Sequence, residues 1–279
     1  MLGVGVNGTV TVDWGDGTEP DVLTGTSTST LVYTPKHEYS KIGDYVISLS
    51  VEGQIKIFGT SSTHVYSRIL TFSTSGDKRN VAYQTSVKRV ELGNDVVIGD
   101  YAFGLCYSLE SISIPIGVTG IGIGAFTSCA CLQFVSIPNG ATTIGTDAFK
   151  SCYSLTTISL PCSITTINNT AFRADYGCKY IVIPSSVTSI DSQAFQGCYS
   201  IVYMPIHSSK ATIQHNAFYM LYGVRYFDFS SCTSVPKLSS SSGFSDCSDD
   251  FQILVPSALY DEWSTATNWA TYASYMVAV

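Results

Sequence analysis

Nine cysteines and four histidines are the residues of this 279-residue chain that could serve as nucleophiles, bases or metal ligands. The sequence contains no C-x-x-C, H-E-x-x-H or G-x-S-x-G pattern, and Cys129 with Cys131 forms an isolated C-x-C, which is a weak metal signal. The histidines are scattered: His37, His64, His207 and His215. We therefore predict that the chain is not an enzyme and has no catalytic residue, metal site or cofactor.

Two groups of acidic residues have the chemistry of cation ligands. Asp13 and Asp16 lie in the motif D-W-G-D-G-T. They could bind calcium, but aspartate in a tight turn also accepts hydrogen bonds from nearby backbone amides, and we favour the turn. Asp246, Asp249 and Asp250 are interpreted as a solvated loop.

Charge and composition exclude several classes of protein. The chain has 14 Lys and Arg against 21 Asp and Glu, a net charge of −7, so it offers no attractive field to nucleic acid. Aromatic residues make up 12%, too many for a disordered chain. The uncharged stretch between Glu110 and Asp147 is interrupted by Pro115 and Pro138, so we predict no membrane insertion.

The elements that would position any site come from an internal repeat of 23 residues. Ala-Phe recurs at this step, with phenylalanine at positions 103, 126, 149, 172, 195 and 218. In each unit an I-x-I strand ends at a proline, and Ala, Phe and Cys share one face of a single helical turn. One unit cannot bury this apolar face alone, so the repeat predicts a solenoid of about six to seven units, with parallel strands and short helical turns.

The repeat also gives the cysteines a structural role. Five of them occupy one repeat position, three residues after Phe: Cys106, Cys129, Cys152, Cys198 and Cys247. Asp175 and Leu221 fill this position in the other two units. We interpret these cysteines as small buried hydrophobic residues.

Aromatic residues form two columns that we predict as ligand-binding candidates. The corner column follows the Cys position and reads Tyr107, Ala130, Tyr153, Tyr176, Tyr199 and Tyr222. The strand column precedes the inward Ile of each strand and reads Ser111, Phe134, Thr157, Tyr180, Tyr203 and Tyr226. By strand alternation the strand column faces outward, whereas the corner column either is exposed or packs between coils.

The units IPIGVTGIGIGAFTSCACL, IPNGATTIGTDAFKSCYSL and IPSSVTSIDSQAFQGCYSI resemble the BspA-type leucine-rich repeat of bacterial surface proteins. The similarity implies a leucine-rich repeat solenoid over residues 85–250. Residues 251–279 resemble the strand and short helices that end this family, with Ser257 as a helix N-cap.

The N-terminal residues 1–59 predict a small all-β module. Val10, Val12 and Trp14 alternate before a Gly-Asp-Gly turn, and a second alternating run begins near Tyr45. D-W-G-D-G-T and the residues His37, Tyr39, Gly43 and Tyr45 resemble a PKD-type immunoglobulin-like module, which could be incomplete here. Residues 60–84 are expected to connect it to the solenoid.

The family resemblance implies a non-enzymatic, cell-surface or secreted protein that adheres to a protein or glycan on a host cell, a neighbouring cell or the matrix. No secretory signal is recognisable at the start of the chain, so the export route is open. The alternative is a structural spacer or a decoration subunit of a larger assembly, such as a virion or surface layer.

Overall fold

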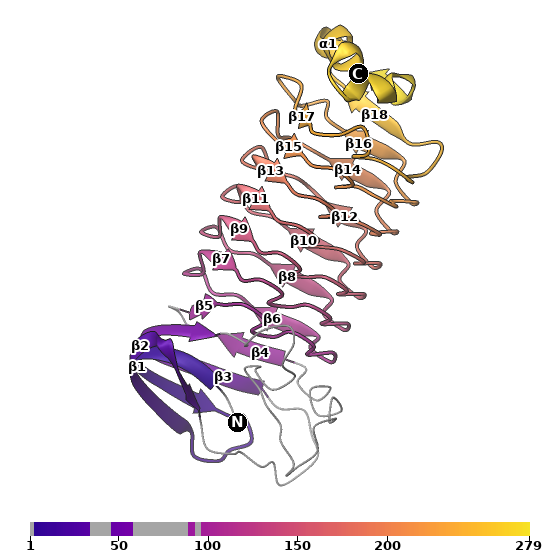
Figure 1. Cartoon of the computed structure of the whole chain (residues 1–279). Helices are drawn as coiled ribbons and strands as arrows, with labels where there is room; N and C mark the ends of the chain where they lie inside the picture. Colours follow the sequence, from indigo (N-terminus) through magenta and orange to yellow (C-terminus); the bar gives the residue numbers. More distant parts are fainter. Residues whose placement is uncertain (1–2, 34–45, 58–88, 93–95) are drawn as a thin grey trace.

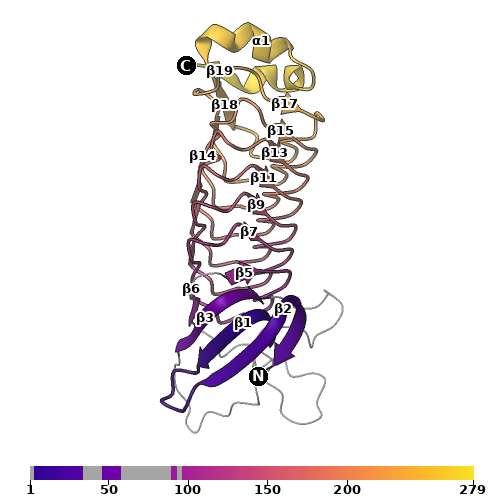
Figure 2. The ribbon, with the colours of Figure 1, turned by 90° about the vertical axis from the view of Figure 1, so that its left-hand side faces the viewer.

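The computed structural model describes residues 3–33, 46–57, 89–92 and 96–279. The chain winds into an elongated solenoid with its termini at opposite ends (Figure 1). Each repeat unit contributes two short strands, and equivalent strands of successive coils pair in parallel. Two ladders therefore run along the axis, and they are seen from a second side in Figure 2.

The first ladder comprises β4 (Arg89–Leu92), β6 (Ser111–Ser113), β8 (Phe134–Ser136), β10 (Thr157–Ser159), β12 (Tyr180–Ile181), β14 (Tyr203–Pro205), β16 (Tyr226–Asp228), β18 (Gln252–Val255) and β19 (Met276–Ala278). The second ladder comprises β5 (Val96–Ile98), β7 (Gly120–Ile121), β9 (Thr143–Ile144), β11 (Thr166–Ile167), β13 (Ser189–Ile190), β15 (Thr212–Ile213) and β17 (Lys237–Leu238). Both confirm the predicted parallel-strand, leucine-rich repeat solenoid.

The core between the ladders follows from the strand pattern. In β6, Ile112 is buried while Ser111 and Ser113 are exposed, and β8 repeats this arrangement. In the second ladder the isoleucine of each strand from β5 to β15 is buried in the same way, and Leu238 takes its place in β17. Because successive side chains of a strand point to opposite faces, each coil buries its isoleucines and leaves the intervening residues outside.

The Ala-Phe dipeptide links the coils on a third side. The buried Phe rings stack in one continuous column, with centroids 5.2 to 5.8 Å apart. The amide of Phe126 donates to the carbonyl of Ala148 in the next coil at 2.7 Å. The predicted helical turn closes i to i+3 bonds, such as Cys106 N to Phe103 O at 3.1 Å. Left-handed residues, including Leu105 with φ 63°, prevent it from continuing as a helix.

The N-terminal strands form an antiparallel sheet that joins the solenoid. β1 (Gly3–Asp13) pairs antiparallel with β2 (Asp21–Tyr33) and β3 (Val46–Ile57), which confirms the predicted hairpin and small sheet. The long β3 then pairs in parallel with both β4 and β5, so it starts both ladders. The backbone of β3 thereby covers the N-terminal edge of the solenoid.

The resemblance to a PKD-type module stays a prediction. The predicted connecting segment, residues 60–84, and the motif residues His37, Tyr39, Gly43 and Tyr45 lie outside the described residues.

The C-terminal end closes the core with aromatic side chains. After β18 come η2 (Ser257–Leu259), α1 (Tyr260–Thr265) and η3 (Trp269–Tyr275). Trp263 and Trp269 are buried and pack against Phe229, with ring centroids 5.0 and 5.4 Å away. The predicted N-cap was wrong, because Ser257 is the first residue of η2 and its hydroxyl instead donates to the carbonyl of Val279 at 3.0 Å.

Candidate functional site

The strand column lies on the outer surface of the first ladder, as strand alternation predicts. Four of its aromatic side chains are exposed, with exposed fractions of 39 to 52%: Phe134, Tyr180, Tyr203 and Tyr226. Parallel pairing places Tyr203 directly between Tyr180 and Tyr226. Thr157 fills the same position between Phe134 and Tyr180. The column is thus a straight row of outward side chains along the axis.

The corner column is both stacked and exposed. Rings of Tyr153, Tyr176, Tyr199 and Tyr222 stack face to face, with neighbouring centroids 5.0 to 5.3 Å apart. All four are exposed, whereas Tyr107 is partly buried. The two predicted alternatives for this column therefore hold together, because stacking covers the ring faces and leaves the edges open.

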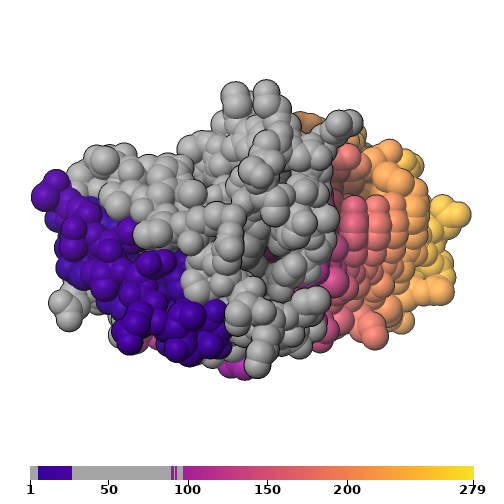
Figure 3. All heavy atoms as spheres, turned by 90° about the horizontal axis from the view of Figure 1, so that it is seen from below, coloured from indigo at the N-terminus to yellow at the C-terminus, as the bar shows by residue number. Residues whose placement is uncertain are grey.

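The two columns together form the surface that we call the aromatic face. Each corner tyrosine precedes its strand-column partner by four residues, as Tyr199 precedes Tyr203. The coils repeat so regularly that side chains of successive units align in rows, as Figure 3 shows for the part of the solenoid that is visible from below. Residues that are 23 apart in sequence thus become neighbours on this face.

A polar cluster ends the strand column, and the sequence patterns did not reveal it. The Tyr203 hydroxyl donates to the carboxylate of Asp228, and the His207 Nδ1 lies 2.6 Å from the Ser231 hydroxyl. The bond to Asp228 raises the pKa of Tyr203 to about 12. Burial acts to raise the pKa of Asp228, but hydrogen bonds from Ser230 and Tyr203 outweigh it and lower that pKa. Asp228 stands two residues after Tyr226, which pairs with Tyr203 at the regular spacing of 23, so strand alternation directs Asp228 to the same outer surface; an acidic residue at this strand position is the sequence signal for the cluster.

The second ladder presents a different outer surface. Thr119, Thr142, Thr165 and Thr188 form an exposed row beside it, which we call the threonine row. The hydroxyls of Thr165 and Thr188 donate to the carbonyls of Thr142 and Thr165, at 3.2 and 3.1 Å. These hydroxyls are therefore partnered by the backbone of the preceding coil.

Four members of the cysteine column are buried as predicted, Cys106, Cys129, Cys152 and Cys198, whereas Cys247 is partly buried. The thiols of Cys129, Cys152 and Cys198 each donate to a Phe carbonyl at 3.1 to 3.2 Å. Burial raises the pKa of the Cys152 and Cys198 thiols well above their usual value, so they stay protonated and unreactive. Cys131 and Cys162 are exposed and lie outside this column.

Asp175 occupies the cysteine position of its coil and is fully buried. One carboxyl oxygen accepts the amide of Cys152 at 2.9 Å, and the other, Oδ2, has no hydrogen-bond partner. Burial raises the pKa of this carboxyl well above its usual value. Burial therefore favours the protonated, neutral form of this carboxyl.

The two acidic groups considered as cation ligands have other roles. Asp13 Oδ1 accepts the amide of Gly15 at 2.8 Å, and Asp16 Oδ1 accepts that of Thr18 at 3.1 Å, so both close the β1–β2 turn. Asp250 pairs with Arg225. Within the described part of the chain no group of three His, Cys, Asp or Glu side chains could hold a metal ion.

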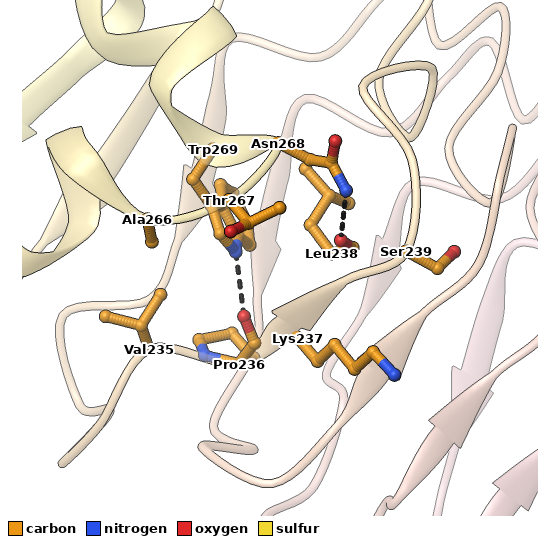
Figure 4. A pocket seen from close by; sticks show the side chains of 9 residues that line it. All are labelled: Val235, Pro236, Lys237, Leu238, Ser239, Ala266, Thr267, Asn268 and Trp269. Carbon is orange, nitrogen blue, oxygen red and sulfur yellow. Dashed lines mark hydrogen bonds between the residues drawn. The ribbon is translucent and has the colours of Figure 1, made fainter.

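A pocket of about 600 Å³ lies beside the C-terminal cap (Figure 4). It is lined by residues 235–239 and 266–269, with β17 on one side. Asn268 Nδ2 donates to Leu238 O at 2.8 Å and Trp269 Nε1 to Pro236 O at 2.7 Å, so the cap covers carbonyls at the open edge of the second ladder. We therefore interpret the pocket as part of the cap that closes the C-terminal end of the solenoid.

No helix in the described ranges is both long and apolar enough to cross a membrane. Comparison with known proteins finds no match among curated sequences. Among solved structures, the chain is similar to a leucine-rich repeat protein of T. pallidum, with 25% identity over 57% of this chain and 74% of the other and a TM-score of 0.44.

Two further solved structures are similar. The pneumococcal vaccine antigen PcpA is 14% identical, over 69% of this chain and 58% of its own, with a TM-score of 0.49. A leucine-rich cell surface protein from Faecalibacterium prausnitzii is 20% identical, over 77% of this chain and 85% of its own, with a TM-score of 0.40.

The family comparison concerns the solenoid itself. Residues 96–225 match the model of the BspA type leucine rich repeat region in six copies. These copies cover the six Ala-Phe dipeptides, four of the five cysteines of the cysteine column, the whole corner column and the strand column up to Tyr203. Residues 96–225, just under half of the chain, are therefore similar to a BspA-type leucine-rich repeat region.

Proposed function

We propose that this chain is a non-enzymatic binding protein, on a bacterial surface or secreted, that recognises a protein or glycan through its aromatic face. The partner would be carried by a host cell, a neighbouring cell or the matrix. The observation that carries the proposal is the row of exposed aromatic side chains on the first ladder, with Tyr180, Tyr203 and Tyr226 in direct succession.

Exposure of these rings is the physical reason for assigning them a partner. Outward positions of a strand make no contribution to the core, so a polar residue would serve folding as well. Ser111 and Thr157 fill the same position in other coils. Clusters of exposed apolar side chains on soluble proteins mark interaction sites, and tyrosine is enriched where binding energy is concentrated.

The polar groups beside the rings add directional contacts. Asp228 and Tyr203 offer a carboxylate and a phenol at one end of the row, and His207 with Ser231 lies nearby. Such groups suit recognition of hydroxyl or amide partners. The net charge of −7 supports a partner other than nucleic acid.

Binding of the purified chain to an array of matrix proteins and glycans tests the proposal. The test variant combines Tyr180→Ser, Tyr203→Ser and Tyr226→Ser. Because truncation of one central aromatic residue commonly costs 2 kcal/mol or more, we expect affinity for any captured ligand to fall by a factor of about 100 or more.

A matched control carries Thr142→Ala, Thr165→Ala and Thr188→Ala on the threonine row, and it should bind like the unaltered chain. Unchanged binding by the tyrosine variant would remove the aromatic face as the site. If the unaltered chain captured no ligand and instead formed ordered assemblies, the spacer or decoration role would replace the binding role.

A further inference from the structure

The tyrosine ladder of the corner column has one missing ring. Tyr153, Tyr176, Tyr199 and Tyr222 stack in four consecutive coils, and the coil before them has Ala130 instead. Tyr107 holds the same position in the coil that precedes that of Ala130. Two coil spacings, about 10 Å in total, therefore separate the backbones of Tyr107 and Tyr153.

The coils do not close over this gap. The amide of Cys131 donates to Tyr107 O at 3.0 Å, and that of Ser154 donates to Ala130 O at 3.1 Å. These bonds hold the coil of Ala130 in the same spacing as its neighbours, so the alanine leaves room for one ring. Ala130 itself is partly exposed at the base of the gap.

The exposed fractions show that the two end rings of the tyrosine ladder each have an uncovered side. Tyr176 and Tyr199, each stacked on both sides, are 42 and 38% exposed. Tyr153 and Tyr222, each stacked on one side, are 47 and 52% exposed. A ring placed at Ala130 would lie about 5 Å from Tyr153, the separation that every neighbouring pair of this ladder already adopts.

Phe134 adds apolar surface at the same coil. It begins the strand that follows Ala130 and is 52% exposed. A planar aromatic ring fits a space one ring thick, whereas the chair of a pyranose is thicker and stacks on a single open ring face. We propose that the gap at Ala130 binds an aromatic side chain of a partner protein, an inference that rests on the proposed binding function and names its partner as protein.

Cys131 provides a means of testing the gap. Its thiol is exposed and free, and its amide bonds to Tyr107. The equivalent Ser200 hydroxyl donates to the carbonyl of Tyr176, so side chains at this position point toward the preceding coil at the base of the ladder. Cys162, the other exposed thiol of the described residues, lies after the proline that ends β10 and serves as an internal control.

The experiment is reversible disulfide exchange on the full chain with two competing reagents, the symmetrical disulfides of 2-phenylethanethiol and 2-cyclohexylethanethiol. The Cys131 thiolate attacks one reagent sulfur, forms the mixed disulfide and releases one thiol, so no external oxidant is needed. Peptide mass spectrometry then measures the phenyl to cyclohexyl ratio at each cysteine. We expect a ratio about fivefold higher at Cys131 than at Cys162.

Filling the gap is the decisive variant. Ala130→Tyr should abolish the phenyl preference at Cys131 while leaving Cys131 able to exchange, because the new ring completes the ladder. Equal ratios at the two cysteines of the unaltered chain, or a preference that survives in Ala130→Tyr, would overturn the proposal.

Two further measurements distinguish a protein partner from a glycan partner, and distinguish the gap at Ala130 from the proposed function of the strand column. Excess N-acetyltyrosine amide should reduce the phenyl preference, and methyl glucoside should not; the reverse result would refute a protein partner. The triple variant of Tyr180, Tyr203 and Tyr226 should retain the preference. If the unaltered chain binds nothing on the array but keeps the phenyl preference at Cys131, the proposed function is rejected and the gap remains a site.

Discussion

The two ladders of the solenoid arise from the same repeat unit but present opposite surfaces. The first ladder carries exposed rings, including Tyr180 and Tyr226, whereas hydroxyls beside the second, such as that of Thr165, bond to backbone carbonyls. Both bury isoleucine in the same way. Folding therefore fixes the inward residues of both ladders and leaves the outward residues open to selection for binding.

The largest expected effect concerns the core that both faces share. Phe149→Ala removes a buried ring that stacks between Phe126 and Phe172 at 5.2 and 5.4 Å. We expect the free energy of unfolding to fall by about 3 to 5 kcal/mol, from lost burial and the cavity left behind. Denaturant unfolding followed by circular dichroism measures this loss.

Phe134→Ala is the matched control, because Phe134 is an exposed ring of the same residue type. Its cost should be within about 0.5 kcal/mol. Similar losses for the two variants would show that the aromatic face supports the fold, and the contrast between the ladders would fail.

The next effect concerns the coil that has an acidic residue, Asp175, at the cysteine position. Asp175→Cys restores the thiol found in neighbouring coils and removes the unpartnered oxygen. We expect a gain of about 1 to 3 kcal/mol in the free energy of unfolding at pH 7. Chemical denaturation of both proteins at several pH values measures the gain.

The pH dependence of that gain has a defined sign. The fold raises the pKa of Asp175, so its contribution to stability is fully present below the ordinary pKa of 3.8 and declines as pH rises toward the raised value. The advantage of Asp175→Cys should therefore grow from acid to neutral pH. An advantage that shrinks over this range would contradict a neutral buried acid.

A smaller effect compares the two outer surfaces directly. Tyr176→Ala removes two stacked contacts, with Tyr153 and Tyr199, and should cost roughly 1 to 2 kcal/mol. Thr165→Ala removes one exposed hydrogen bond and should cost about 0.5 kcal/mol. Thermal and denaturant unfolding of the two variants ranks them. A greater loss from Thr165→Ala would mean that the threonine row, rather than the tyrosine ladder, ties the coils together.

The smallest effect is a titration within the strand column. Asp228→Asn removes the carboxylate that accepts the Tyr203 hydroxyl, so the pKa of Tyr203 should fall from about 12 toward its usual 10.0. Ultraviolet absorbance titration, with Tyr203→Phe to identify the signal, measures it. In the unaltered chain, the stability that this bond contributes below pH 10.0 is lost as pH rises toward 12. A Tyr203 titration unchanged by Asp228→Asn would exclude the bond as its cause.

Much of the solenoid was predictable because each coil repeats the same local choices. The spacing of Phe103 and Phe126 predicts a stacked core, and alternation around Ile112 predicts outward Ser111. The N-cap role of Ser257 was wrong, since its hydroxyl bonds to Val279, which is distant in sequence. The polar cluster at Tyr203 was missed because the repeat pattern assigns no charged side chain to this strand position, and Asp228 occupies it in a single coil, in register with Pro205.

The sequence by itself determined the solenoid, its buried cysteines and the outward direction of the strand column. Periodicity suffices there, because one unit cannot bury its apolar face until identical units stack on it. Only the tertiary structure decided that corner tyrosines are stacked and exposed at once, that β3 starts both ladders, and that Asp175 has one unpartnered oxygen. Those features depend on contacts between residues far apart in the chain, whose distances no local pattern specifies.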